Sequence, residues 1–155
     1  MTLNFRIIPF DSHYLEPASV LHRACLEECW SLATLKETMA EPTIIGFTAV
    51  QIAPSDPLIG FIIVRIILDE AEILTLVVSP HTRRQGVGRS LVKKALNAAY
   101  KKGVQHIYLE AAENNIAALR LYSLFGSEKY GERAGYYSSN KGCNQAAILL
   151  KLKKN

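Results

Sequence analysis

The residue pattern changes abruptly near residue 80, and this change limits the possible folds more than any other feature. Before it lie three runs rich in β-branched residues, 44–52, 58–68 and 71–78, which predict strands. After it, apolar residues recur at helical spacing over 87–102, with lysines on the other side. Strands that lead directly into a helix of this kind are typical of a mixed α/β fold.

The rest of the chain extends this pattern. We expect a strand over 4–9, a helix from Asp11–Ser12 to about Cys29, a helix capped by Ser31 that ends before Pro42, a strand over 104–111, a helix over 115–125 closed by Gly126, and two strands within 127–152. The order β-α-α-β-β-β-α-β-α-β-β predicts an α/β (α+β) fold with a mixed central sheet of six to seven strands and helices on both faces. The length of 155 residues predicts a single domain over 1–155.

Charge and hydropathy exclude several classes of protein. The net charge of +4 comes largely from lysine pairs and a basic tail, which are typical of solvated helix faces rather than of a nucleic-acid stripe. The most apolar run, 58–68, is interrupted by Arg65 and is too short to span a bilayer. Residues 1–10 predict a strand instead of a signal peptide. We therefore expect no nucleic-acid partner and no membrane partner.

The three cysteines are too few, and odd in number, for a disulfide framework, which favours a reducing, cytoplasmic location. His22, Cys25 and Cys29 are spaced as partial metal ligands on one helix face. Ordinary helix packing explains them better, because no fourth ligand is evident. We expect no metal site.

Residues 83–90, RRQGVGRS, form the start of the helix predicted over 87–102. A helix start exposes unpaired backbone N–H groups and the positive end of the helix dipole. Gly86 and Gly88 would let an anion approach this backbone, and Arg83, Arg84 and Arg89 add positive charge. The segment predicts a pyrophosphate site, although a solvated basic turn remains open.

Two other phosphate-binding motifs fit less well. A P-loop is excluded because no Gly-Lys-Ser/Thr follows the glycines. A dinucleotide-binding fold is an alternative, since Glu110 stands near the distance expected for its acidic residue. Against it, Leu91 occupies the third glycine position, and the glycines lie several residues beyond the strand end.

The run Arg83-Arg84-Gln85-Gly86-Val87-Gly88 matches the Arg/Gln-x-x-Gly-x-Gly/Ala signature, and the chain therefore resembles the GNAT superfamily of N-acetyltransferases. It is most similar to the RimI-type branch, the ribosomal-protein-alanine N-acetyltransferases. The shared positions are Cys29-Trp30-Ser31, Leu109-Glu110, Asn115, Leu121-Tyr122, Gly126 and Tyr136-Tyr137. The resemblance implies direct transfer of an acetyl group from acetyl-CoA to an amine, by preference the N-terminal alanine of a small-subunit ribosomal protein.

The resemblance also implies the roles of individual residues. Glu110 would be the general base and Tyr122 the general acid, while Asn115 would hold the cofactor arm. The strand over 71–78 would splay from the strand over 104–111. Acetyl-CoA would then bind to the backbone of Leu76, Val77 and Val78 and to the loop residues Arg83, Arg84, Gln85, Gly86, Val87, Gly88 and Arg89.

The residues themselves leave these roles open. A strand-end glutamate such as Glu110 often faces solvent, and a helical tyrosine such as Tyr122 often packs in a core. Asn115, Leu119 and Tyr122 share one helix stripe, so Asn115 could equally be a polar residue at the helix N-terminus. Trp30, Tyr136 and Tyr137 could border the acceptor groove or pack within the fold.

Two departures from the RimI-type pattern concern the acceptor. The arginine of Glu-Val-Arg-x-Ser-Asn is replaced by Ala112, and the phenylalanine of Gly-Phe is replaced by Ser127. A small amine, polyamine or aminoglycoside is therefore an alternative acceptor, and Glu27, Glu28, Glu37 and Glu41 could hold such a cation. A non-catalytic CoA-binding module is a further alternative. We expect a monomer or weak dimer.

Overall fold

The computed structural model describes residues 2–26, 29–138 and 144–154, with no side-chain description for 136–138 and 144. Its elements are β1 (Phe5–Pro9), α1 (Leu15–Cys25), α2 (Leu32–Ala40), β2 (Ile44–Gln51), β3 (Leu58–Ile67), β4 (Glu70–Val78), α3 (Val87–Lys101), β5 (His106–Ala112), α4 (Ile116–Ser123), β6 (Glu128–Ser138) and β7 (Asn144–Lys153). Short 3₁₀ turns precede α1 and follow β4. The predicted order of strands and helices is confirmed.

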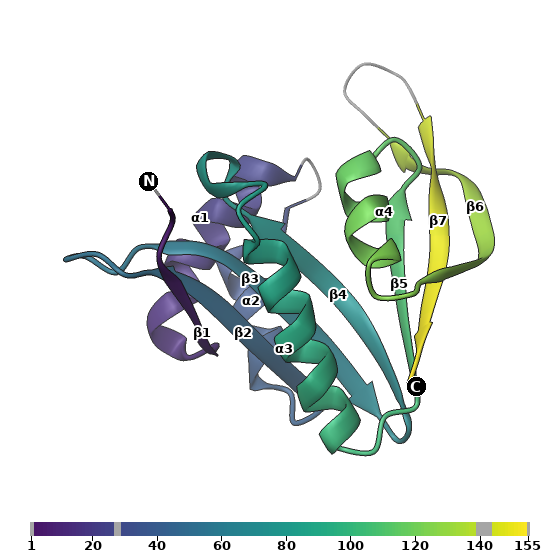
Figure 1. Ribbon diagram of the computed structural model, residues 1–155, viewed down its shortest axis with the longest axis horizontal. Helices are drawn as coiled ribbons and strands as arrows, with labels where there is room; N and C mark the ends of the chain where they lie inside the picture. The colour runs from purple at the N-terminus through teal and green to yellow at the C-terminus, as the bar shows by residue number, and fades with distance from the viewer. Residues whose placement is uncertain (1, 27–28, 139–143, 155) are drawn as a thin grey trace.

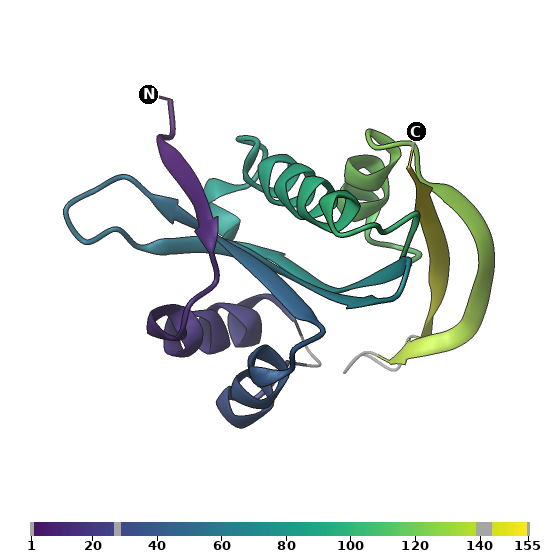
Figure 2. The same cartoon turned by 90° about the horizontal axis from the view of Figure 1, so that it is seen from below.

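The seven strands form one sheet in the order β1-β2-β3-β4-β5-β7-β6. The β4–β5 pair is parallel and the other pairs are antiparallel, so the predicted mixed sheet is confirmed. Helices α1 and α2 cover one face, and α3 and α4 cover the other (Figures 1 and 2). The right-handed crossover expected for a parallel pair is made by α3, which joins β4 to β5.

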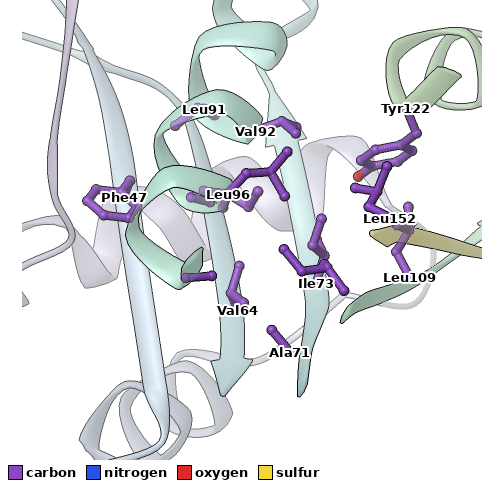
Figure 3. Packing of buried hydrophobic residues seen from close by; sticks show 14 of the residues in the cluster. Phe47, Val64, Ala71, Ile73, Leu91, Val92, Leu96, Leu109, Tyr122 and Leu152 are labelled. Carbon is purple, nitrogen blue, oxygen red and sulfur yellow. The ribbon is translucent and has the colours of Figure 1, made fainter. Parts of the chain in front are cut away.

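Each face of the sheet has its own hydrophobic core. Under α3 and α4, buried side chains such as Leu91, Val92 and Leu109 pack with Tyr122, as Figure 3 shows. On the opposite face, Ala18 and Leu35 of the two N-terminal helices pack against Phe61, Ile63 and Val77. The central strands are therefore buried on both faces, which explains why they read as continuous apolar runs.

Strands β4 and β5 are paired at one end only. Three residue pairs join them, from Glu70 with His106 to Glu72 with Tyr108. From Ile73 onward β4 continues to pair with β3, whereas β5 pairs with β7 over its whole length. The two strands therefore diverge toward their C-terminal ends (Figure 1), as the resemblance to the GNAT superfamily implies.

A β-bulge lies where this divergence begins. The β3–β4 register shifts between Ile63 paired with Thr75 and Val64 paired with Ile73, so Leu74 is the extra residue. Before the bulge, Ile73 packs under α3, whereas Leu74 packs under α1 and α2. After it, Leu76 packs under α3 and Val77 on the other face. A bulge re-aims the side chains that follow it, and here those residues border the open part of the sheet.

Helix α1 ends at Cys25, four residues earlier than predicted. Leu26 is already extended, with φ −129° and ψ 136°. The imidazole of His22 accepts a hydrogen bond from the Trp30 backbone N–H at 3.1 Å, which draws the chain back toward the helix. The helical spacing of His22, Cys25 and Cys29 therefore did not predict the helix end, because this hydrogen bond joins residues that periodicity does not connect.

Candidate active site

A cavity of about 630 Å³ lies where β4 and β5 diverge. Its lining comes from α1 and the segment after it (His22, Cys25, Leu26, Trp30), β4 (Ile73, Leu74, Thr75, Leu76), β5 (Leu109, Glu110, Ala111, Ala112), the start and inner face of α4 (Asn114, Asn115, Ala118, Tyr122) and Gln145. The cavity therefore contacts elements on both faces of the sheet. Of the predicted site residues, it brings together Leu76, Glu110, Asn115 and Tyr122.

Glu110 lies on β5, and strand alternation turns it away from the core under α3, where Leu109 packs. Its side chain is 23% exposed, and one carboxylate oxygen forms an ion pair with the Arg133 guanidinium of β6 at 3.3 Å. Glu110 also borders a second cavity of about 290 Å³ at the paired end of β4 and β5. No local pattern in the chain indicates Arg133, because a third strand, β7, lies between β5 and β6 in the sheet.

Tyr122 reaches the cavity from the opposite face. Its side chain is 5% exposed and packs in the core under α3 and α4 (Figure 3). Burial raises the pKa of its phenol well above the usual value, because a phenolate would lose its hydration there. The hydroxyl therefore stays protonated at neutral pH, so this residue is able to donate a proton but not to accept one as a phenolate.

Asn115 is the N-cap of α4. Its side-chain oxygen accepts a hydrogen bond from the Ala118 backbone N–H at 3.1 Å. This is the helix-terminal role that the sequence left open, and it occupies the amide oxygen. The exposed side chain also borders the cavity, so its amide N–H₂ group remains available to a ligand.

The hydrogen-bond pattern of β4 distinguishes among Leu76, Val77 and Val78. Just after β4, Ser79 donates its backbone N–H to the carbonyl of Ile59 on β3 at 2.8 Å. In an antiparallel ladder, hydrogen-bonded and non-hydrogen-bonded pairs alternate, so Val77 turns its backbone toward β3. Consistent with this, a Cβ placed on Gly60 would lie 2.8 Å from the Val77 carbonyl oxygen. Leu76 and Val78 therefore direct their backbone groups toward the space between β4 and β5.

The predicted anion-binding loop lies outside the lining of the large cavity, just beyond the end of β4. Gly86 is the N-cap of α3 with φ +87°, and no side chain caps the helix there. Arg84 also has a positive φ, of 60°. Arg83 donates from Nε to the Val78 carbonyl at 3.2 Å, and Arg84, Gln85 and Arg89 are exposed. The loop thus presents uncapped helix N–H groups between exposed cations.

Gly88 differs from Gly86 because it lies in the helix and close to other elements. A Cβ placed on Gly88 would lie 3.2 Å from Cδ2 of Leu121 on α4 and 3.6 Å from Cγ2 of Val78. A Cβ placed on Gly86 would have no other atom within 4 Å, but the positive φ of this residue disfavours any side chain there. Gly88 therefore allows α4 to approach α3 closely, while Gly86 allows the backbone turn.

His22 and Trp30 meet at the α1 side of the cavity. His22 is 1% exposed, and its Nε2 lies 3.2 Å from the Thr75 hydroxyl of β4. The ring centroids of His22 and Trp30 are 5.5 Å apart. Since Nδ1 of His22 accepts the Trp30 N–H, this ring nitrogen is not free to bind a metal. Within the described residues, no group of three or more His, Cys, Asp or Glu side chains is arranged as a metal site.

Comparison with known proteins now identifies the family. The model of the Acetyltransferase (GNAT) family matches residues 13–126, which is more than two thirds of the chain and includes β4, the loop, Glu110 and Tyr122. The chain belongs to the GNAT family of acetyltransferases. It is therefore an N-acetyltransferase, and this finding excludes the dinucleotide-binding alternative.

The relatives of this GNAT acetyltransferase include the ribosomal protein bS18-alanine N-acetyltransferases. The protein of that name from Escherichia coli K12 is 30% identical over 120 residues, 77% of this chain and 78% of the relative. The one from Haemophilus influenzae is 30% identical over 121 residues, 78% and 80% of the two chains.

Solved structures of N-acetyltransferases are similar to this chain in fold. The crystal structure of the Escherichia coli ribosomal-protein-S18-alanine N-acetyltransferase superposes with a TM-score of 0.87 at 27% identity, covering 96% of this chain and 93% of that one. Arabidopsis thaliana NAA60 in complex with acetyl-CoA, at 20% identity, has a TM-score of 0.86 over 97% and 98% of the two chains and shares the fold.

The aromatic residues expected near the acceptor groove of this GNAT acetyltransferase are only partly described by the structure. Trp30 both borders the cavity and packs in the core under α1 and α2. Tyr136 and Tyr137 lie in β6, but their side chains fall outside the description, as do Glu27 and Glu28. None of the described helices is long and apolar enough to cross a membrane.

Proposed function

We propose that this N-acetyltransferase transfers the acetyl group of acetyl-CoA to the α-amine of a protein N-terminus, and that its acceptor is the N-terminal alanine of a small-subunit ribosomal protein. Acetyl-CoA is the co-substrate of the GNAT acetyltransferases to which the chain belongs. The acceptor follows from the relatives, which are named for ribosomal protein bS18-alanine. One observation supports an acceptor with a single charged amine: the described lining of the cavity contains a single carboxylate, that of Glu110.

The proposed chemistry is a direct transfer within a complex of both substrates. An α-amine has a pKa near ~8, so most of it carries a proton at pH 7 that must be removed before attack. Glu110 accepts this proton, and the amine nitrogen then forms a bond to the thioester carbonyl carbon. As the carbon–sulfur bond breaks, Tyr122 donates its proton to the departing thiolate. The nitrogen, positively charged after attack, loses its second proton to form the amide, and a proton from solvent restores the Tyr122 phenol.

The other proposed contacts hold the co-substrate. The backbone N–H groups of Leu76 and Val78 would pair with the cofactor arm and stabilise the negative charge that develops on the carbonyl oxygen. The amide N–H₂ of Asn115 would add a hydrogen bond from the α4 side. The pyrophosphate would bind at the uncapped start of α3 beside Arg83, Arg84 and Arg89.

The acceptor end of the cavity favours an amine with a single positive charge, such as the α-amine of a protein N-terminus. Among the described residues of the lining, Glu110 carries the one carboxylate, and its neighbours across the cavity include Cys25, Leu26, Trp30 and Leu74. A polyamine or aminoglycoside carries several charges, each of which needs an acidic partner once it leaves water. Of the acids considered for that role, Glu37 lies outside the lining and Glu41 pairs with Arg65 at 3.2 Å.

A panel of acceptors tests this function. We expect acetylation of a peptide that begins with alanine, measured by release of free CoA thiol and by mass spectrometry of the peptide. The same peptide with a blocked N-terminus and an internal lysine is the matched control and should gain no acetyl group. Faster turnover with spermidine, or with the lysine of the blocked peptide, would overturn the proposed acceptor while leaving the family assignment intact.

A further inference from the structure

The hydrogen bonds of His22 define its tautomer. Nδ1 accepts the Trp30 backbone N–H at 3.1 Å, so this nitrogen carries a lone pair and no proton. In the neutral ring the proton then resides on Nε2, which donates it to the Thr75 hydroxyl at 3.2 Å. Burial lowers the pKa of His22, which favours this neutral form. Both ring nitrogens are therefore engaged with fixed polarity.

The two partners of His22 belong to different walls of the cavity. Thr75 follows the bulge residue Leu74 and precedes Leu76, whose backbone faces the space between β4 and β5. Trp30 lies in the segment that leaves α1 and precedes the Ser31 cap of α2. His22 thus connects the segment on the α1 side of the cavity to the strand on which the thioester is proposed to bind.

The ring of His22 has little freedom to take another orientation. This ring contacts the aromatic rings of Trp30, at a centroid distance of 5.5 Å, and of Phe61 on β3, at 6.1 Å. Turning the ring would leave buried polar groups without hydrogen-bond partners, which costs free energy. The hydrogen bonds and the ring contacts therefore favour the same orientation of His22. His22 is therefore a direct polar link between the Trp30 backbone and β4, beside the apolar packing of Trp30 in the same core.

We propose that His22 is a positioning residue for the acceptor: through its hydrogen bonds to Trp30 and Thr75 it holds the acceptor wall of the cavity at a fixed distance from the β4 backbone. This inference rests on the proposed function, because it assumes that the amine enters between these walls. His22 itself takes no part in proton transfer. Of the proposed acetyl-CoA contacts, those at the start of α3 and on α4 lie away from this bridge, and the Leu76 backbone adjoins it, so its loss affects the acceptor more than the co-substrate.

Three substitutions separate the contributions of the bridge. His22→Leu removes both hydrogen bonds and keeps an apolar side chain. His22→Asn keeps an acceptor near the position of Nδ1 for the Trp30 N–H. Thr75→Val removes the second partner in a strand that favours β-branched residues. His13→Asn, at an exposed position before α1, is the matched control.

We expect His22→Leu to raise the KM for the alanine peptide about tenfold, a loss on the scale of the two hydrogen bonds it removes, and to leave the Kd for CoA within about twofold. His22→Asn should recover most of this loss, and Thr75→Val should reproduce part of it. An unchanged peptide KM, an equal weakening of CoA binding, or no recovery in His22→Asn would each overturn the inference. If His22→Leu does not fold, Thr75→Val decides by the same criteria.

A measurement without substrate separates this inference from the proposed function. Trp30 is the only tryptophan in the chain, so tryptophan fluorescence reports on the surroundings of this one partner of His22. Acrylamide should quench Trp30 more strongly in His22→Leu than in the wild type or His13→Asn. If the wild type acetylates no N-terminal peptide while this difference is found, the proposed function fails and the bridge stands. If acetylation is found without the difference, the inference alone fails.

Discussion

The two residues proposed for proton transfer reach the same cavity in opposite environments. Glu110 is partly exposed and paired with Arg133, whereas Tyr122 is almost fully buried in an apolar core. Burial keeps the Tyr122 phenol neutral, whereas the Glu110 carboxylate lies within reach of solvent and of the Arg133 guanidinium. One group is thus prepared to receive a proton and the other to release one, and the thioester would lie between them.

Replacing either residue should reduce turnover and leave co-substrate binding intact. We expect Glu110→Gln and Tyr122→Phe each to lower kcat by about 10²-fold or more, the usual contribution of a general acid or base. The Kd for CoA, measured by titration calorimetry, should stay near the wild-type value. Glu37→Gln, at an exposed position on α2, is the control for Glu110→Gln. Wild-type kcat in both active-site variants would contradict the mechanism.

His22 should make the stability of the protein depend on pH. Its pKa is lowered in the folded state, while the unfolded chain has the ordinary value near ~6.5. Below that value the unfolded state binds the proton more readily, so the free energy of unfolding falls as the pH is lowered and is fully retained above it. The groups that contact the ring, Trp30, Thr75 and Phe61, carry no charge that would offset this effect.

Urea unfolding of the wild type and of His22→Asn between pH 7.5 and pH 5 measures this dependence. The variant has no titrating group at this position, so the difference in free energy of unfolding should shift in its favour as the pH falls. The slope contributed by one group has a ceiling of about 1.4 kcal/mol per pH unit. Parallel curves for the two proteins would contradict the prediction, and His13→Asn should follow the wild type.

At the scale of elements, the start of α3 depends on two glycines with different purposes. Gly86 allows a left-handed backbone turn that leaves the first helical N–H groups uncapped. Gly88, two residues further on and inside the helix, leaves room for Leu121 of α4. One glycine therefore shapes the proposed pyrophosphate site, and the other sets the packing of two helices beside it.

Alanine substitutions should separate these purposes. Gly86→Ala strains a left-handed residue at a cost of about 1–2 kcal/mol and should weaken CoA binding by disturbing the turn. Gly88→Ala should lower the free energy of unfolding mainly through the contact with Leu121. Titration calorimetry and urea unfolding of both variants give the two quantities. Full CoA affinity in Gly86→Ala would exclude the turn as the pyrophosphate site.

At the scale of the whole molecule, the sheet consists of two parts joined by a short parallel contact. Strands β1 to β4 form one part and β5 to β7 the other, with three residue pairs between β4 and β5 (Figure 1). A co-substrate bound where these strands diverge would contact both parts. Since a ligand that binds only the folded state adds about 2.7 kcal/mol at a concentration of 100 Kd, binding should also stabilise this junction.

Amide hydrogen exchange tests the junction at single residues. Without ligand, the N–H groups of Leu76 and Val78 should exchange faster than that of Val77, which faces β3. Addition of CoA should slow Leu76 and Val78 more than Val77, and NMR would resolve the three amides. Equal exchange of the three in the ligand-free protein would contradict the assigned alternation of the strand.

The sequence by itself determined the order of the elements, because periodicity and caps such as Ser31 are local properties. Through the resemblance, it also indicated Glu110, Asn115 and Tyr122 as residues of one site, and the structure places all three on one cavity. The tertiary structure alone decided which β4 amides face the cavity, the pairing of Glu110 with Arg133, and the bridge from His22 to Thr75. These contacts join residues far apart in the chain, 53 positions in the case of His22 and Thr75, and no local pattern records them.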